Sequence, residues 1–327
     1  MNVGKRRVIG ASEVGLPLLG VGCGSLANAA GEDSFDAMID YAWQRGIRYF
    51  DTAALYLGGE SERRLGTALG ERAADRAIIS TKVGRYQNHT GSSIDPASKR
   101  SFFDYSRDTT FRSVEQSLAR LKLDRLDLVM IHDVDHDLCG DDYQRRFDEA
   151  MEGAYQALVS LRASGVVKAI GVAAMDWVAC FEFAKAGDFN AVMPAGEYTL
   201  LHQDCTPLLN HCLDTGLAWI AASPFNSGIL ATGAIANAFY DMKPATPEVL
   251  DRVARLEAIC ARHGVPLAAA ALQFPTRHPA VSSVVVGNKS PRELEVNLEL
   301  LNHPIPDALW DELNMERNHQ VKHGATA

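Results

Sequence analysis

The stretch IRYFDTAALY, residues 47–56, starts as a strand and then changes abruptly in polarity. Residues 47–50 read as a buried strand, Asp51 ends it, and Tyr56 follows five residues later. Nearly continuous apolar runs of this kind are typical of parallel strands that are covered on both faces. Seven further runs along the chain resemble it: LPLLGVGCG, RAIISTKVG, LDLVMIHD, VVKAIGVAA, FNAVMPAGE, LAWIAASPF and VSSVVVGN.

Amphipathic segments of helical length separate these runs, as in EDSFDAMIDYAWQRG, FRSVEQSLARLK and DEAMEGAYQALVSLRASG. Several of them end at a glycine, which indicates a left-handed helix cap; these are Gly46, Gly165, Gly187 and Gly216. Eight strand–helix units predict an α/β fold of the (β/α)8 TIM-barrel type. A doubly wound open sheet is the alternative, but no strand is followed by GxGxxG or a Walker-type glycine loop.

We expect one domain over residues 1–327, because no linker or low-complexity segment interrupts the alternation. Residues 1–17 should form a small hairpin over one end of the barrel, and 315–327 a C-terminal tail. Three connections are long and irregular, at 84–108, 133–146 and 231–249. In a barrel all three lie on the face that holds the C-terminal strand ends, where barrel active sites are found.

Composition excludes several classes of protein. The 327 residues carry a formal net charge of −9 with no dense basic run, which argues against a nucleic-acid or anionic-membrane partner. The first twenty residues hold no continuous apolar stretch of signal-peptide length, and no segment is long and apolar enough to predict a membrane span. Six scattered cysteines without CxxC pairing suggest a reduced, cytoplasmic protein. No metal-ligand spacing appears, since His132 and His136 are separated by a strand end; we expect no metal, and a monomer or homodimer.

Three consecutive predicted strands finish on titratable residues, namely Asp51, Lys82 and His132. Taken singly, each could be a strand meeting water or a structural histidine. In a barrel, however, the three strand ends are neighbours, and Tyr56 is close enough to fold back over them. A phenol has a pKa near 10, a nearby ammonium favours the phenolate, and a carboxylate holds the ammonium in place. Such a unit suits proton transfer at a carbonyl or alcohol oxygen, with the histidine orienting the substrate.

The segments FDTAALYLGGESERRLGTAL, ISTKVG and DLVMIHD resemble the signature segments of the aldo-keto reductase superfamily, and the resemblance covers nearly the whole chain. It implies a (β/α)8 barrel that binds a nicotinamide dinucleotide without a Rossmann domain. It also implies Tyr56 as the general acid/base, Lys82 and Asp51 as its tuning pair, and His132 as the substrate-orienting residue.

The same resemblance implies a cofactor site in two segments. SPFNSGIL matches the pyrophosphate loop, and GNKSPRELEVN matches the adenosine site. Glu293 stands where many NADPH-preferring members have arginine, which favours NAD, although Lys289 and Arg292 keep NADP possible. The implied cofactor residues are Ser223, Phe225, Asn226, Ser227, Gly228, Leu230, Gly287, Asn288, Lys289, Glu293 and Asn297.

The chain departs from the family pattern around the nicotinamide. Ala173 and Ala174 replace a frequent Ser-Asn pair, Ala195 a frequent glutamine, and Ala222 an aromatic residue. We therefore expect the carboxamide to be held by other groups or by water.

FDYSRDTTFRSVEQSLARLKLDRLDLVMIHDVDH and GEYTLLHQDCTPLL resemble the sugar-oxidising branch of the superfamily, although Glu197 replaces an arginine common there. This implies oxidation of an aldose of the L-fucose, D-arabinose or L-galactose type at C1 to the lactone. Alternatives are oxidation of pyridoxal, NADPH-dependent reduction of aldehydes, and a nicotinamide-binding regulatory subunit. Candidate substrate residues in the long connections are Tyr86, His89, Asp135 and His136.

Overall fold

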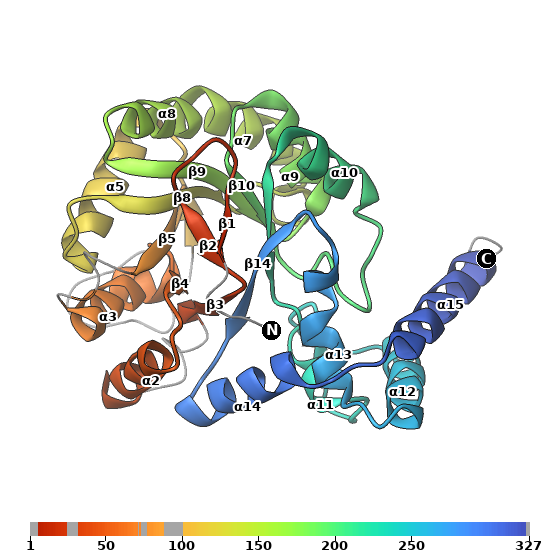
Figure 1. Ribbon diagram of the computed structural model, residues 1–327. Helices are drawn as coiled ribbons and strands as arrows, with labels where there is room; N and C mark the ends of the chain where they lie inside the picture. Colours follow the sequence, from red (N-terminus) through yellow and green to blue (C-terminus); the bar gives the residue numbers. More distant parts are fainter. Residues whose placement is uncertain (1–5, 25–31, 71, 73–76, 88–100, 325–327) are drawn as a thin grey trace.

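Eight parallel strands close into a barrel in the computed structural model, which describes residues 6–24, 32–70, 72, 77–87 and 101–324 (Figure 1). Each strand pairs with its neighbours in the order in which the strands occur along the chain. All eight predicted strands are therefore confirmed. They are β3 (Leu19–Gly22), β4 (Tyr49–Asp51), β5 (Ile78–Val83), β8 (Leu126–His132), β9 (Val167–Ala174), β10 (Ala191–Pro194), β11 (Ala218–Ala222) and β14 (Val281–Gly287).

Helices surround the barrel, and the (β/α)8 expectation holds (Figure 1). Several helices begin at a side chain that accepts a hydrogen bond from the first turn, as Ser106, Asp176 and Thr246 do. The helices are α2 (Glu32–Gln44), α3 (Glu60–Leu69), α5 (Arg107–Leu121), α6 (His136–Cys139), α7 (Tyr143–Glu149), α8 (Gln156–Ala163), α9 (Trp177–Ala186), α10 (Thr206–Thr215), α11 (Ile229–Thr232), α12 (Pro247–Arg262), α13 (Leu267–Gln273), α14 (Pro291–Asn302) and α15 (Asp307–Gly324).

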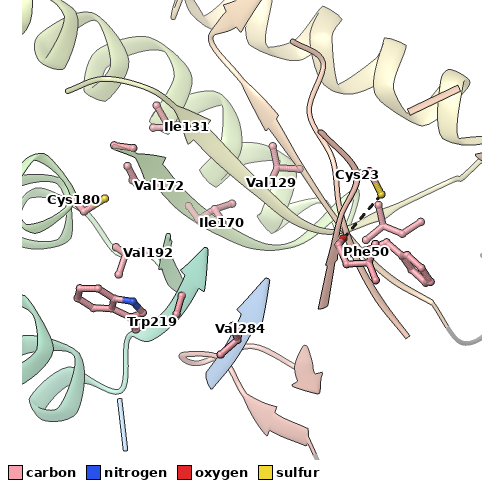
Figure 2. Packing of buried hydrophobic residues seen from close by; sticks show 14 of the residues in the cluster. Cys23, Phe50, Val129, Ile131, Ile170, Val172, Cys180, Val192, Trp219 and Val284 are labelled. Carbon is pink, nitrogen blue, oxygen red and sulfur yellow. Dashed lines mark hydrogen bonds between the residues drawn. The ribbon is translucent and has the colours of Figure 1, made fainter. Parts of the chain in front are cut away.

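Side chains alternate between the two faces of every barrel strand, because the period of a strand is two residues. In β8, Val129 and Ile131 belong to the apolar layer between barrel and helices, where they pair with residues of β9 (Figure 2). Leu128 and Met130 belong to a separate cluster inside the barrel. The same alternation turns His132 inward, so the strand period itself aims this residue at the barrel interior.

The N-terminal hairpin is present as expected. β1 (Arg6–Val8) pairs antiparallel with β2 (Gly15–Pro17), and the hairpin crosses one end of the barrel (Figure 1). Ile9 and Leu16 are fully buried in the interior cluster with residues from the beginnings of β5 and β8. The hairpin thus seals the N-terminal end of the barrel with apolar side chains, and it leaves the opposite end for chemistry.

The three long connections are more regular than we expected. The first contains an antiparallel ribbon of β6 (Arg85–Gln87) and β7 (Ser101–Phe103), and the third contains a short ladder of β12 (Phe239–Tyr240) and β13 (Lys243–Pro244). The expectation of an irregular loop at 133–146 is wrong. Asp135 accepts a hydrogen bond from the Leu138 amide 2.8 Å away and caps α6, after which the chain continues through α7.

Two further expectations need correction. Gly187 is extended, with φ −144°, rather than left-handed; a Cβ there would come within 2.7 Å of the Phe189 ring, so close packing accounts for the glycine. The C-terminal tail expected from residue 315 is helical as far as Gly324, within α15. In the described part of the chain, no helix is long and apolar enough to cross a membrane.

All six cysteines are free thiols, as the sequence suggested. Only Cys139 is partly exposed, and the other five pack as small apolar side chains.

Candidate active site

The C-terminal ends of three adjacent strands bring Asp51, Lys82 and His132 to one rim of the barrel. β4, β5 and β8 are neighbours, with Asp51 opposite Ser80 and Lys82 opposite Met130 in the register. The three side chains are 2 to 5% exposed. The charged residues therefore lie inside the barrel mouth and not in bulk water.

Lys82 is the centre of a buried hydrogen-bond network. Its Nζ donates to Asp51 Oδ2 at 2.7 Å and to the Thr52 carbonyl at 2.9 Å. The other Asp51 oxygen accepts from Ser80 Oγ at 2.6 Å, and Ser80 in turn contacts the Tyr49 hydroxyl at 3.0 Å. Asp51 ends β4 and Thr52 directly follows it, so this strand fixes two of the partners that hold the ammonium in position.

Tyr56 completes the set from a short turn after β4. Its hydroxyl accepts from Lys82 Nζ at 3.2 Å. Leu57 and the two glycines after it have positive φ values of 50°, 59° and 91°, which turns the chain back over the barrel mouth. Gly24 approaches the Tyr56 ring so closely that an added Cβ would lie 3.2 Å from it.

The two partners in this contact have pKa values that are shifted in the same direction. Burial opposes the charge on Lys82, but Asp51 and Tyr56 outweigh it and raise the pKa of the ammonium. Burial also raises the pKa of Tyr56, and Lys82 acts against this effect without cancelling it. The ammonium lowers the pKa of the phenol, as expected from the sequence, but burial outweighs this contribution and the net pKa is raised.

His132 is neutral in this surrounding. Burial lowers the pKa of its imidazole well below the usual value, and the charges of Lys82 and Arg85 lower it further. Its ring meets the Tyr56 ring edge-on, with the centroids 6.0 Å apart. A neutral imidazole has one donor and one acceptor nitrogen, so it can hydrogen-bond an alcohol or a carbonyl oxygen.

A cavity of about 500 Å³ opens over these four residues. Ala173, Ala174, Ala195 and Ala222, the positions that depart from the family pattern, all line it. The three long connections contribute to its wall through Arg85, Asp133, Asp137, Leu138, Asp241, Met242 and Lys243. A larger cavity of about 640 Å³ lies between α12, α15 and residues 200–204, and none of the four residues borders it.

The predicted pyrophosphate loop begins at the same cavity, which Ser223 lines at the end of β11. Ser223, Asn226 and Ser227 have φ values of 56°, 44° and 58°, and Gly228 follows at 100°. Such left-handed turns expose backbone N–H groups to anions. Asn226 donates to the Gly196 carbonyl at 3.1 Å, while its own Oδ1 is buried without a partner. Phe225 is only partly buried, whereas Leu230 packs fully inside.

The predicted adenosine segment begins at Gly287, which also lines the cavity. Asn297 Nδ2 donates to Asn288 Oδ1 at 2.8 Å, and both side chains are buried. Glu293 accepts from the Lys289 amide at 2.8 Å, and its own amide donates to Ser290 Oγ at 3.2 Å. This arrangement resembles a capping box at the start of α14, except that the carboxylate accepts from the residue before the N-cap Ser290. Glu293 therefore has a structural role that the sequence argument did not include.

The described candidates for substrate contact do not line the cavity. The Tyr86 hydroxyl accepts from the Gly84 amide at 2.9 Å. Asp135 caps α6, and His136 pairs with Asp176 and stacks on Tyr143. His89 lies outside the described residues.

Arg85 and Asp133 do line the cavity, and the sequence argument missed both. Arg85 Nη1 lies 2.6 Å from Asp133 Oδ2, and the same oxygen lies 3.4 Å from His132 Nε2. Burial raises the pKa of Asp133, and Arg85 acts in the opposite direction. The sequence does contain a signal for Asp133: it is a carboxylate at the C-terminal end of a predicted strand, directly after His132, and Asp51 has the same kind of position at the end of β4. Among the described residues, no group of three or more His, Cys, Asp or Glu side chains could hold a metal ion.

Residues 18–315 match the Aldo/keto reductase family, so this chain belongs to that family and is one of its oxidoreductases. D-threo-aldose 1-dehydrogenase of Pseudomonas sp is 38% identical over 93% of this chain and 94% of its own length. Pyridoxal 4-dehydrogenase of Microbacterium luteolum is 34% identical over 97% of this chain and 98% of its own. The fold agrees with the holo form of an aldo-keto reductase from Bacillus halodurans, with a TM-score of 0.77, 23% identity, and coverage of 95% and 96% of the two chains.

Proposed function

We propose that this protein oxidises an aldose at C1 to the lactone, with NAD as the hydride acceptor and Tyr56 as the general base. The observation that carries the proposal is the 3.2 Å contact between Lys82 Nζ and the Tyr56 hydroxyl, at the floor of a cavity that His132 also lines. The similarity to D-threo-aldose 1-dehydrogenase supports the choice of an aldose.

The residues at the ends of β11 and β14 fit a nicotinamide dinucleotide. Ser223 and Gly287 place the two candidate cofactor segments on the same cavity as Tyr56. The left-handed turn at 226–228 suits a pyrophosphate, and the buried Oδ1 of Asn226 has no hydrogen-bond partner among the described residues. When bound, this cofactor supplies the hydride acceptor.

The chain's own residues account for the movement of the proton. Tyr56, as phenolate beside the Lys82 ammonium, accepts the proton of the anomeric hydroxyl as C1 gives up its hydride. Asp51 and the Thr52 carbonyl hold the Lys82 ammonium in place, so its positive charge stays beside the Tyr56 oxygen while the proton moves. His132, neutral and inward-facing, hydrogen-bonds the oxygen that becomes the lactone carbonyl.

The proposal is tested with a panel of L-fucose, D-arabinose, L-galactose and pyridoxal, in which NADH formation is followed at saturating NAD. We expect the aldoses to be oxidised with the higher kcat/KM. Pyridoxal oxidation is the second candidate function, because the relative from Microbacterium luteolum has nearly the same length and 34% identity. Turnover of pyridoxal without turnover of any aldose would replace the first candidate by the second.

We also expect NAD to bind more tightly than NADP. The Glu293 carboxylate is fixed at the start of α14 by the Lys289 amide, where it would repel a 2′-phosphate. Arg292, which could have attracted that phosphate, is paired with Glu295 at 2.7 Å. Glu293→Gln removes the negative charge, so the NADP dissociation constant should fall several-fold. Glutamine can still act in the helix cap, so thermal stability should change little. Fluorescence titration with both cofactors measures this, and tighter binding of NADP by the wild-type protein would contradict the argument.

A further inference from the structure

Asp133 has a backbone conformation that is uncommon among residues other than glycine. It directly follows His132, its φ is 57°, and it is 7% exposed. Left-handed backbone at a buried residue that is not glycine costs free energy, and such residues persist where the surroundings fix them, often at active sites. The conformation turns the carboxylate to the same cavity that His132 lines.

The surroundings fix this backbone at several points. The Tyr105 hydroxyl donates to the carbonyls of His132 at 2.7 Å and Asp133 at 3.2 Å. The Asp133 amide donates to the Ala173 carbonyl at 2.7 Å. Gly84, with φ 101°, lets the Tyr105 ring pass, because an added Cβ would overlap the ring. Tyr105 therefore fixes the backbone of His132 and Asp133, whose side chains both line the cavity.

Arg85 holds the Asp133 side chain. Its Nη1 lies 2.6 Å from Asp133 Oδ2, and the two side chains are only 22% and 10% exposed. A buried ion pair contributes little or nothing to stability compared with apolar residues, because both charges lose their hydration. Stability of the fold therefore does not explain why the chain keeps this pair and the left-handed backbone of Asp133. Both residues line the same cavity as Tyr56 and His132.

Resting on the proposed function, we infer that the Asp133–Arg85 pair binds the hydroxyl on the carbon next to the one oxidised, the 2-hydroxyl of an aldose. His132 Nε2 and Asp133 Oδ2 are 3.4 Å apart. The two oxygens of a vicinal diol are joined by only three covalent bonds, so two protein atoms this close together can each reach one of them at an ordinary hydrogen-bond distance of about 2.8 Å. His132 can therefore hold the reacting oxygen while the carboxylate accepts from the oxygen beside it and Arg85 donates to it.

This geometry selects a substrate class. A cyclic aldose presents a hydroxyl next to C1, whereas in the hemiacetal of pyridoxal the neighbouring carbon belongs to the aromatic ring and carries none. The pair should therefore favour the aldose.

The test compares D-arabinose with 2-deoxy-D-ribose, which differ only at the 2-hydroxyl, in the wild-type protein and in Asp133→Asn. A hydrogen bond to a charged group corresponds to a preference of roughly 10- to 100-fold. We expect the kcat/KM ratio of the two sugars to fall by about that factor in Asp133→Asn, mostly through loss with D-arabinose. The kcat/KM ratio of the two sugars in the wild-type protein is compared with the same ratio in Asp133→Asn. The effect that the 2-hydroxyl itself has on the reactivity of C1 is the same in both proteins and therefore cancels.

Asp127→Asn is the matched control, since Asp127 lies at the start of the same strand and pairs with Lys168 at 2.7 Å, away from the cavity. It should leave the sugar ratio unchanged. Arg85→Met provides a second route and should lower the ratio in the same direction. An unchanged ratio in both folded variants of the pair would overturn the inference. If the wild-type protein oxidises neither sugar nor any other aldose, the proposed function fails instead.

Discussion

Tyr56→Phe should lower kcat for aldose oxidation by roughly two to four orders of magnitude, the usual contribution of a positioned acid or base. Phenylalanine keeps the ring against Gly24 and removes only the hydroxyl that contacts Lys82 Nζ at 3.2 Å. Cofactor affinity should change little, because the candidate cofactor segments lie on other strands. Stopped-flow single turnovers and a fluorescence titration of NAD measure the two quantities separately.

The pH profile adds a readout that a structural defect would not reproduce. Because burial raises the pKa of Tyr56, the phenolate fraction is small at neutral pH and grows as pH rises. Wild-type kcat/KM for oxidation should therefore rise about tenfold per pH unit below that pKa, and Tyr56→Phe should lose this dependence. A wild-type protein with tight NAD binding but almost no turnover would instead support a regulatory subunit.

Lys82→Met should reduce both turnover and stability. The ammonium is the charge that favours the phenolate, so kcat should fall by at least about a hundredfold. Among the described side chains, Asp51, 4% exposed, would keep only Ser80 as a partner, and an unpaired buried charge costs about 3 to 5 kcal/mol. Urea unfolding at pH 7, together with steady-state kinetics, measures the two losses.

The double variant Asp51→Asn/Lys82→Met separates these effects. Removing the orphaned charge should restore much of the unfolding free energy, yet turnover should stay low because the ammonium is still missing. Lys168→Met, which breaks the Lys168–Asp127 pair at the other end of β8, should leave kcat unchanged. Recovery of activity in the double variant would show that Lys82 acts only through folding.

The barrel and its four-residue site were predictable because both follow from local rules. Parallel strands alternate with helices, and the two-residue period aims Asp51, Lys82 and His132 at the same interior. Arg85 was beyond such rules. It stands in a stretch that reads as a loop, and it pairs across the β6–β7 ribbon with Phe103, eighteen residues further along the chain.

In the connection at 133–146, the sequence predicts a loop where the structure contains helices. Its aspartates and glycine read as a loop, yet Asp135 acts as a helix cap and α6 and α7 follow. Short polar residues favour loops and helix starts alike, so the sequence alone does not distinguish the two. This ambiguity affects the site, because the sequence favours Asp135 and His136 as substrate residues, whereas Asp133 is the residue of this connection that lines the cavity beside His132.

The apolar hairpin at the N-terminal end of the barrel also bears on how the protein could be handled. The turn between β1 and β2 has exposed side chains at Ala11 and Glu13, and it lies at the end of the barrel away from the catalytic cavity. Exposed turn tips are the positions that best tolerate insertions. A tether introduced there would hold the protein on an electrode or bead with the cavity facing the solution, so that substrate and cofactor could exchange freely.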